Sequence, residues 1–265
     1  MNIAIIGAGN MGSAVARGVM RNTSEHNIYI SNPSKGKLEA LQQEFPQIRV
    51  TTKNKEAVKG ADLVILAVKP WLMPQVLLEV GAVMDYDRQV LASLAGGVDF
   101  EKLEHHLPLH GMEEKYPTLC RVMPNTAIAL GSSMTFISTK YSTREKDDAL
   151  VRLFSIMGKT MLIPESLMPA ATSLASCGIA FAMRYVRAAM EGGVELGFRP
   201  HEAQEIVCQT LQGAIDLLSQ EGAHPEAEID KVTTPGGLTI KGLNAMEECG
   251  FTHSVQQGLR ASLKE

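Results

Sequence analysis

Short apolar runs alternate with amphipathic stretches through the N-terminal part of the chain. The segments Gly12–Arg21 and Lys35–Glu44 have helical periodicity, whereas Leu63–Val68 is apolar without alternation. Unbroken apolar runs are typical of parallel strands buried on both faces, and intervening helices indicate a sheet covered on both sides. The predicted strands are Asn2–Ile6, Asn27–Ile30, Leu63–Val68, Gln89–Ser93, Arg121–Met123 and Met134–Ser138.

After Ile163 and Pro164 the strand pattern stops and helical patterns follow. Gly197 is typical of a helix end, and Pro200 is typical of the next helix start. We therefore predict an α/β domain over residues 1–162, with a doubly wound, mostly parallel sheet, and an all-helical domain over residues 163–265. The strongest predicted helices are Ala170–Leu196, Arg199–Glu221 and Leu238–Glu248.

Charge and composition exclude some partners. The 265 residues carry a net charge of only −4, which argues against a dedicated nucleic-acid binder. The chain does not start with the pattern of a signal peptide. Val122–Thr139 and Ser166–Met183 lack charges and approach the length of a membrane span, but both contain polar residues, glycine and proline, so we expect buried segments and no membrane partner.

The cysteines are consistent with the same class of protein. They lie far apart and form no C-x-x-C pattern, as expected for reduced thiols in a soluble cytoplasmic protein. They are Cys120, Cys177, Cys208 and Cys249.

A G-x-G-x-x-G pattern follows directly on the first predicted strand and opens a helix, which is the context of a Rossmann-like dinucleotide site. Gly7 permits the tight turn, Gly9 lets the backbone approach the pyrophosphate, and Gly12 lets the helix pack closely on the strand. The helix N-terminus offers N–H groups to phosphate. An ordinary glycine-rich turn is the alternative. The predicted contacts of a nicotinamide dinucleotide here are Gly7, Gly9, Asn10, Met11 and Gly12.

The end of the second strand bears on which dinucleotide is bound. NAD-binding sites usually carry an acidic residue there, but this chain has Ser31, Asn32, Ser34 and Lys35. Hydroxyls, an amide and a lysine suit a 2′-phosphate, so NADPH is favoured and NADH remains possible. Ser34 is alternatively a cap for the helix that starts at Lys35. Lys69, after the strand Leu63–Val68, is either a cofactor contact or a solvated loop residue.

A second glycine-rich loop lies in the predicted helical domain. The pattern indicates a turn that leads into a helix, formed by Thr234, Pro235, Gly236, Gly237, Leu238 and Thr239. Paired glycines expose backbone N–H groups, and a helix N-terminus favours an anion, so the loop suits a small carboxylate. A plain helix cap with a turn explains the pattern equally well.

The segment Val232–Leu243, with its Pro-Gly-Gly-x-Thr element, resembles the signature of the pyrroline-5-carboxylate reductases. These enzymes reduce a cyclic imine with NAD(P)H in the last step of proline synthesis. Segments 5–12, 61–70 and 121–126 agree and run in the family's order. The chain departs from the family at residues 175–181, where Cys177 and Ile179 are unusual, and at Thr234 and Leu238. These departures bear on the shape of the substrate pocket more than on the reaction.

The resemblance implies a homodimer, often assembled into larger homo-oligomers, with the substrate carboxylate on a Thr234–Thr239 loop that a partner subunit supplies. It also implies that further residues border the cofactor, namely Asn54, Val68, Lys69, Pro70 and Asn125. The predicted substrate contacts are Thr234, Gly236, Gly237, Leu238 and Thr239. We expect the Thr239 hydroxyl to act on the imine nitrogen, because the matched motifs contain no obvious acid. We also expect the imine to arrive protonated.

Two other functions compete with this one. The first is another NADPH-dependent imine or hydroxyacid reductase. Hydroxyacid dehydrogenases present a catalytic lysine on a helix after the first domain, but Ser166–Gln220 contains no lysine. The second is a non-enzymatic NADPH sensor. No metal site is expected, since His105, His106 and His110 match no recognised ligand pattern.

Overall fold

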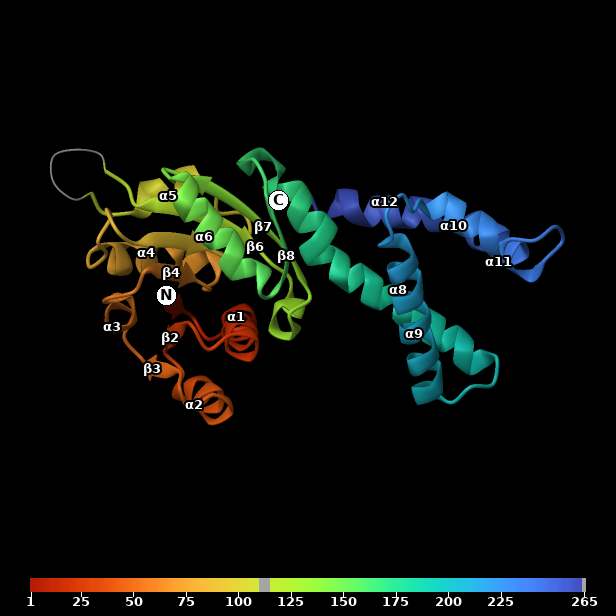
Figure 1. The fold of residues 1–265 in the computed structure, drawn as a ribbon, viewed down its shortest axis with the longest axis horizontal. Coiled ribbons are helices and arrows are strands. Elements are labelled where there is room, and N and C mark those ends of the chain that lie inside the picture. Colours follow the sequence, from red (N-terminus) through yellow and green to blue (C-terminus); the bar gives the residue numbers. More distant parts are fainter. Residues whose placement is uncertain (110–114, 264–265) are drawn as a thin grey trace. The chain divides into compact units, whose positions relative to one another are not determined.

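The computed structural model describes residues 1–109 and 115–263. Its contacts divide the chain into two compact units, Met1–Ser176 and the residues from Cys177 onward. Both units can be followed by colour in Figure 1. We refer to them as the sheet unit and the helical unit.

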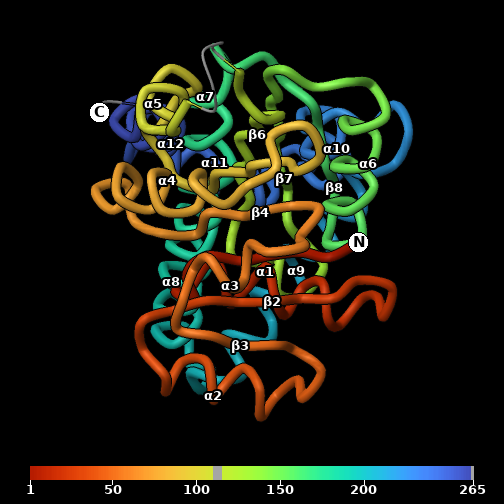
Figure 2. The backbone as a smooth tube through the Cα atoms, turned by 90° about the vertical axis from the view of Figure 1, so that its left-hand side faces the viewer, coloured from red at the N-terminus to blue at the C-terminus, as the bar shows by residue number. Residues whose placement is uncertain are grey.

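The sheet unit is built on eight strands in the order β3-β2-β1-β4-β5-β6-β7-β8. Neighbouring strands are parallel, except that β6 and β7 are antiparallel. In Figure 2, the labelled strands β3, β2 and β4 lie in this order across the sheet, with β1 between β2 and β4. The predicted doubly wound, mostly parallel sheet is confirmed. The strands are β1 (Asn2–Ile6), β2 (Asn27–Ser31), β3 (Arg49–Thr51), β4 (Leu63–Leu66), β5 (Val90–Ser93), β6 (Thr118–Met123), β7 (Ser133–Lys140) and β8 (Gly158–Leu162).

Helices cover both faces of this sheet because successive residues of a strand point to opposite sides. Ile3 and Ile5 of β1 belong to a core shared with α1, α2 and α6. Ala4 and Ile6 belong to a second core shared with α3, α4 and α5. These helices are α1 (Asn10–Asn22), α2 (Lys35–Glu44), α3 (Asn54–Val58), α4 (Met73–Gly81), α5 (Phe100–His106) and α6 (Arg144–Ser155). Shorter turns are η1 (Pro70–Leu72), η2 (Thr126–Leu130), η3 (Glu165–Leu167) and α7 (Met168–Ala171).

The apolar pattern did not predict β3 and β8, which are the two edge strands of the sheet. β3 has only three residues, and most of β8 is exposed or half-buried. An edge strand is covered less completely than a central one, so it needs no continuous apolar run. The missing signal therefore follows from the position of these strands.

The boundary between the two units, as defined by their contacts, lies later in the chain than residue 162, where the sequence pattern changes. Met168 and Ala171 form a small buried cluster with Met123 and Phe136. The Ser176 hydroxyl donates to the Pro124 carbonyl oxygen at 2.7 Å. These contacts tie the first helical turns after β8 to the sheet.

The helical unit contains α8 (Gly178–Glu195), α9 (Pro200–Leu218), α10 (Pro225–Val232), α11 (Leu238–Glu248) and α12 (Phe251–Ala261). A π-helical turn, η4 (Thr172–Cys177), leads into α8. Gly197, with φ of 106°, follows the end of α8, and Pro200 starts α9, as predicted. The helices α10 and α12 are additional to those predicted.

The expectation that Ser166–Met183 is buried holds for Met168 and Ala171 but is wrong for much of the segment in the single chain. Leu174 is 65% exposed and Met183 is 60% exposed. The helical run Glu165–Glu195 is long and apolar enough to cross a membrane, with 17% of its most apolar window buried. One such helix is weak evidence for a membrane span. The other uncharged segment, Val122–Thr139, forms parts of β6 and β7 with η2 between them.

Candidate functional site

The glycine loop lies at the carboxyl end of β1, the sheet edge where ligands bind in open α/β folds. Gly7 has φ of 108°, and a Cβ there would lie 2.7 Å from the Ala67 carbonyl oxygen. A Cβ on Gly12 would lie 1.9 Å from the Gly7 carbonyl oxygen. At Gly9, by contrast, a Cβ would meet nothing within 4 Å. The loop therefore requires glycine at Gly7 and Gly12 for folding, whereas Gly9 faces open space.

The end of β2 holds this loop in place. Gly7 N–H donates to the Ser31 carbonyl oxygen at 2.8 Å. Ala8 N–H donates to Asn32 Oδ1 at 3.1 Å, and the Asn32 amide donates to the Ser34 carbonyl oxygen. Asn32 thus acts mainly on the shape of the loop.

The N-terminus of α1 is open to an anion. Its cap residue is Gly9, which offers no side-chain cap, and Asn10 and Met11 begin the helix without an acidic residue in the first turn. Uncapped N–H groups and the positive end of the helix dipole favour a phosphate at this position. The loop geometry and the electrostatics therefore both fit a pyrophosphate.

The side chains predicted near the 2′ position differ in exposure. Ser31 is fully buried, and its hydroxyl donates to Asn54 Oδ1 at 2.7 Å. The Asn54 amide donates to Glu79 Oε2 at 2.9 Å. Ser34 and Lys35 are exposed, and Ser34 makes no side-chain cap to α2. The structure brings Ser31 and Asn54 together and adds Glu79, for which the sequence held no signal because it lies within an amphipathic helix.

The remaining predicted cofactor residues follow β4 and β6. Val68 borders Gly7, because its Cγ1 would lie 3.2 Å from a Cβ there. Lys69 and Pro70 are exposed, and the Lys69 ammonium group lies 5.9 Å from the centre of the Trp71 ring. Asn125 is largely buried, and its side-chain oxygen accepts from Ala127 N–H at 3.0 Å to cap η2.

The second predicted loop forms a tight turn before α11. Gly236 has φ of 72°, and Gly237 N–H donates to the Thr234 carbonyl oxygen at 2.9 Å. Gly237 caps α11 without a side-chain bond, and no acidic residue lies in the first turn. Leu238 is 87% exposed, and Thr234 and Thr239 are exposed as well. The loop therefore presents an uncapped helix N-terminus to solvent, with Gly237 N–H already used inside the turn.

Two family models match the chain. One, described as pyrroline-5-carboxylate reductase dimerisation, matches residues 165–265. The other, described as NADP oxidoreductase coenzyme F420-dependent, matches residues 2–97. Among similar proteins, pyrroline-5-carboxylate reductase 2 of Dictyostelium discoideum is 33% identical over 100% of this chain and 91% of its own length. The chain belongs to the pyrroline-5-carboxylate reductase family.

Other members of the pyrroline-5-carboxylate reductase family agree. Reductase 1 of Dictyostelium discoideum is 35% identical over 98% of this chain, although the chain spans only 48% of that protein's length. The crystal structure of the 1-pyrroline-5-carboxylate reductase from Streptococcus pyogenes is 27% identical, with a TM-score of 0.86 over 99% of this chain and 96% of that one. The predicted family, an oxidoreductase with a Rossmann-like sheet and a helical dimerisation domain, is confirmed.

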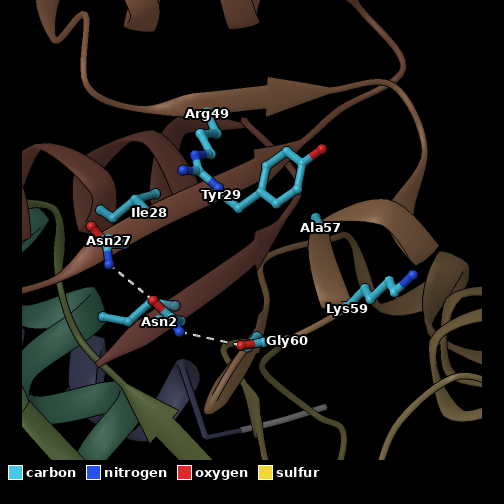
Figure 3. A pocket seen from close by; sticks show the side chains of 10 residues that line it. Asn2, Asn27, Ile28, Tyr29, Arg49, Ala57, Lys59 and Gly60 are labelled. Atoms are coloured by element: carbon cyan, nitrogen blue, oxygen red, sulfur yellow. Dashed lines mark hydrogen bonds between the residues drawn. The ribbon is translucent and has the colours of Figure 1, made fainter.

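A cavity of about 140 Å³ lies elsewhere in this reductase-family fold (Figure 3). It is lined by Asn2, Asn27 and Arg49, the first residues of β1, β2 and β3, and so lies at the sheet edge opposite the glycine loop. Asn27 donates to Asn2 Oδ1 at 3.0 Å, and Asn2 donates to the Gly60 carbonyl oxygen. Asn2 thus links Asn27 to Gly60, and the cavity contains none of the predicted site residues.

The clustered histidines lie on or after α5. The His105 and His106 rings pack edge to face with their centres 4.9 Å apart. His110 lies outside the described residues. Within residues 1–109 and 115–263, no three His, Cys, Asp or Glu side chains are grouped so that they could hold a metal ion.

Proposed function

We propose that this protein reduces 1-pyrroline-5-carboxylate to L-proline with NAD(P)H. The family match over the whole chain supports this function. The observation that supports it most directly is that two helices have uncapped N-termini. One is α1, which begins after the open loop at Gly9, and the other is α11, which begins after the Gly236–Gly237 turn. A dinucleotide pyrophosphate and a small carboxylate are both anions of the kind that such N-termini bind.

The residues of the chain position the reactants. The bound dinucleotide supplies the hydride for the imine carbon. The loop at Gly9 and the first turn of α1 hold the pyrophosphate. Gly236 and Leu238 N–H groups and the Thr234 hydroxyl hold the carboxylate, since Gly237 N–H is engaged in the turn. Positioning of this kind supplies much of the rate enhancement of hydride transfer.

Thr239 acts on the nitrogen in this proposal. Its hydroxyl donates a hydrogen bond to the lone pair that develops on the nitrogen as hydride reaches the neighbouring carbon and the C=N π electrons move to the nitrogen. The cyclic imine enters already protonated, so the nitrogen keeps its proton and becomes the amine of proline. Thr239 therefore orients the substrate and does not supply a proton.

The active protein is a homodimer, or a larger homo-oligomer, in which the Thr234–Thr239 loop of one subunit serves the dinucleotide site of its partner. The match to a dimerisation model and the exposed apolar side chains of α8 support this assembly. NADPH is the favoured dinucleotide because Lys35 is exposed at the start of α2. The four unpaired cysteines support a cytoplasmic location.

The test is loss of the nicotinamide absorbance of NADPH when the purified protein receives pyrroline-5-carboxylate. A parallel reaction receives small 2- and 3-hydroxyacids with NADP⁺ and is followed by the gain of that absorbance. We expect oxidation of NADPH with the cyclic imine, formation of proline in equal amount, and no reaction with the hydroxyacids. Turnover of hydroxyacids alone would contradict the proposal, as would binding of NADPH without turnover of the imine.

A further inference from the structure

Three side chains form a hydrogen-bonded chain at the carboxyl end of β2. Ser31 donates to Asn54 Oδ1 at 2.7 Å, and Asn54 Nδ2 donates to Glu79 Oε2 at 2.9 Å. The residues come from β2, α3 and α4. Ser31 also accepts the Gly7 N–H through its carbonyl oxygen, so this chain lies directly beside the glycine loop.

Glu79 fixes the direction of these bonds. A carboxylate can only accept hydrogen bonds, so Asn54 must turn its NH₂ group toward Glu79. Its oxygen therefore faces Ser31, and the Ser31 hydroxyl must donate to it. Ser31 is 0% exposed, whereas Asn54 and Glu79 are half-buried. Of the three, only Asn54 and Glu79 have surface that a ligand can reach.

The position of this pair defines its ligand. In dinucleotide-binding sheets, the group that recognises the ribose 2′ position stands at the end of the second strand and is an acid in NAD-binding proteins. Here β2 ends in Ser31, and residues 32–38 contain no acid. Glu79 places a carboxylate one hydrogen bond beyond Asn54, at the same edge. An amide and a carboxylate can together donate to and accept from a 2′-hydroxyl, whereas the carboxylate repels a 2′-phosphate.

The cations near this site offset this repulsion only in part. Lys53 pairs with Glu56 at 3.1 Å, and Glu56 also accepts from the Thr51 hydroxyl at 2.6 Å. The Thr51 bond and Lys53 lower the pKa of Glu56, so it stays charged and balances Lys53. Lys35 is exposed and has no ion pair within the described parts of the chain. Lys35 therefore attracts a 2′-phosphate, whereas Glu79 repels it.

We propose that Glu79 is a specificity-determining residue that, acting with Asn54, lets the site accept NADH as well as NADPH. This inference rests on the proposed binding of a nicotinamide dinucleotide. It assigns to a residue of α4 the role that an acid at the end of β2 plays elsewhere. Glu79 does not touch the reacting atoms.

The experiment measures the dissociation constants of NADPH and NADH by titration calorimetry on the full-length protein. Glu79→Gln keeps the size of the side chain and removes its charge. Glu79→Lys reverses the charge, and Lys35→Gln removes the opposing cation. The control is Glu25→Gln, because Glu25 is exposed and precedes β2 at the opposite edge of the sheet.

We expect Glu79→Gln to raise the preference for NADPH over NADH by about tenfold, mostly through tighter binding of NADPH. Glu79→Lys should raise it further, Lys35→Gln should lower it, and Glu25→Gln should leave it unchanged. A purely structural effect weakens both dinucleotides equally, because they differ only in the 2′-phosphate. An unchanged or lower preference in both Glu79 variants overturns the inference.

The same titrations separate this inference from the proposed reaction. If the wild-type protein binds both dinucleotides and the Glu79 variants shift the preference, the inference stands even when pyrroline-5-carboxylate is not reduced. If the wild-type protein binds neither dinucleotide, both the inference and the proposed function are wrong.

Discussion

The two units of this molecule bury their apolar side chains to very different extents. Every residue of β4, β5 and β6 is buried in the sheet unit. In the helical unit, α8, α10, α11 and α12 contain no buried residue, and α9 contains only Ala203. The sheet unit has a complete core of its own. The helical unit exposes apolar surface of the kind that marks an interaction site, so we expect it to gain stability when another surface covers it.

The two glycine loops differ in the same way. The loop at Gly7 is fixed by hydrogen bonds to the buried end of β2 and by close contact with Ala67. The turn at Gly236 is held by one bond between Gly237 and Thr234, and its neighbours are exposed. A rigid loop suits a cofactor that must be held in one geometry, whereas an exposed loop is consistent with our proposal that a second subunit completes the site.

The largest effect is expected for Gly12→Ala in the sheet unit. The new Cβ would lie 1.9 Å from the Gly7 carbonyl oxygen, so strand and helix must separate. We expect a loss of about 3 kcal/mol or more in the free energy of unfolding, measured by urea denaturation. Gly9→Ala is the matched control, because its Cβ meets nothing within 4 Å. It should fold normally and weaken dinucleotide binding; equal stability of the two variants would contradict this account of the loop.

A charge on the helical unit should break the assembly. Met183 of α8 and Leu78 of α4 are both 60% exposed in the single chain. We expect Met183→Glu to raise the dissociation constant of the dimer about a hundredfold or more, because it buries an unpaired charge. Leu78→Glu should leave the dimer intact. Sedimentation at several protein concentrations measures both, and dimers of equal strength would show that α8 does not form the contact.

Thr239→Val tests the exposed loop, because it removes the hydroxyl with almost no change in the shape of the side chain. Loss of the hydroxyl should lower kcat for imine reduction by about a hundredfold, the usual cost of one hydrogen-bond donor at a reacting centre. The dissociation constant of NADPH, measured by calorimetry, should stay unchanged because the glycine loop lies in the other unit. Thr239→Ser restores the hydroxyl and should recover most of the activity. A fully active valine variant would remove Thr239 from the proposed mechanism.

The sequence could predict most of the sheet and the glycine loops, because both depend on local signals. Central strands such as β4 require continuous apolar runs, and the tight turns at Gly7 and Gly237 require glycine. Glu79 could not be found this way, since its link to Asn54 depends on how α3 and α4 pack. The sequence could not decide what covers α8, because an apolar helix has the same sequence pattern whether its own chain or a partner covers it.

The smallest expected effect is on how stability depends on pH, and it again differs between the two units. Burial raises the pKa of Tyr86 to about 12 from its ordinary value of 10.0, and its hydroxyl donates to the Pro108 carbonyl oxygen at 2.9 Å. Because the folded pKa is the higher one, the stabilisation is fully present below about pH 10 and is lost as the pH rises through about 12. Tyr86→Phe should therefore lose about 1 kcal/mol of stability at neutral pH and decline less steeply above pH 10, as followed by urea denaturation across the pH range.

Burial also raises the pKa of the Cys120 thiol in the same unit, so only part of the alkaline decline should disappear in this variant. Tyr185 of the helical unit is 41% exposed in the single chain, and Tyr185→Phe is the matched control. When the chain is monomeric during the measurement, the Tyr185→Phe variant should lose stability at high pH as steeply as the wild type does. An equal change in slope for both variants would mean that the alkaline sensitivity does not come from the buried core of the sheet unit.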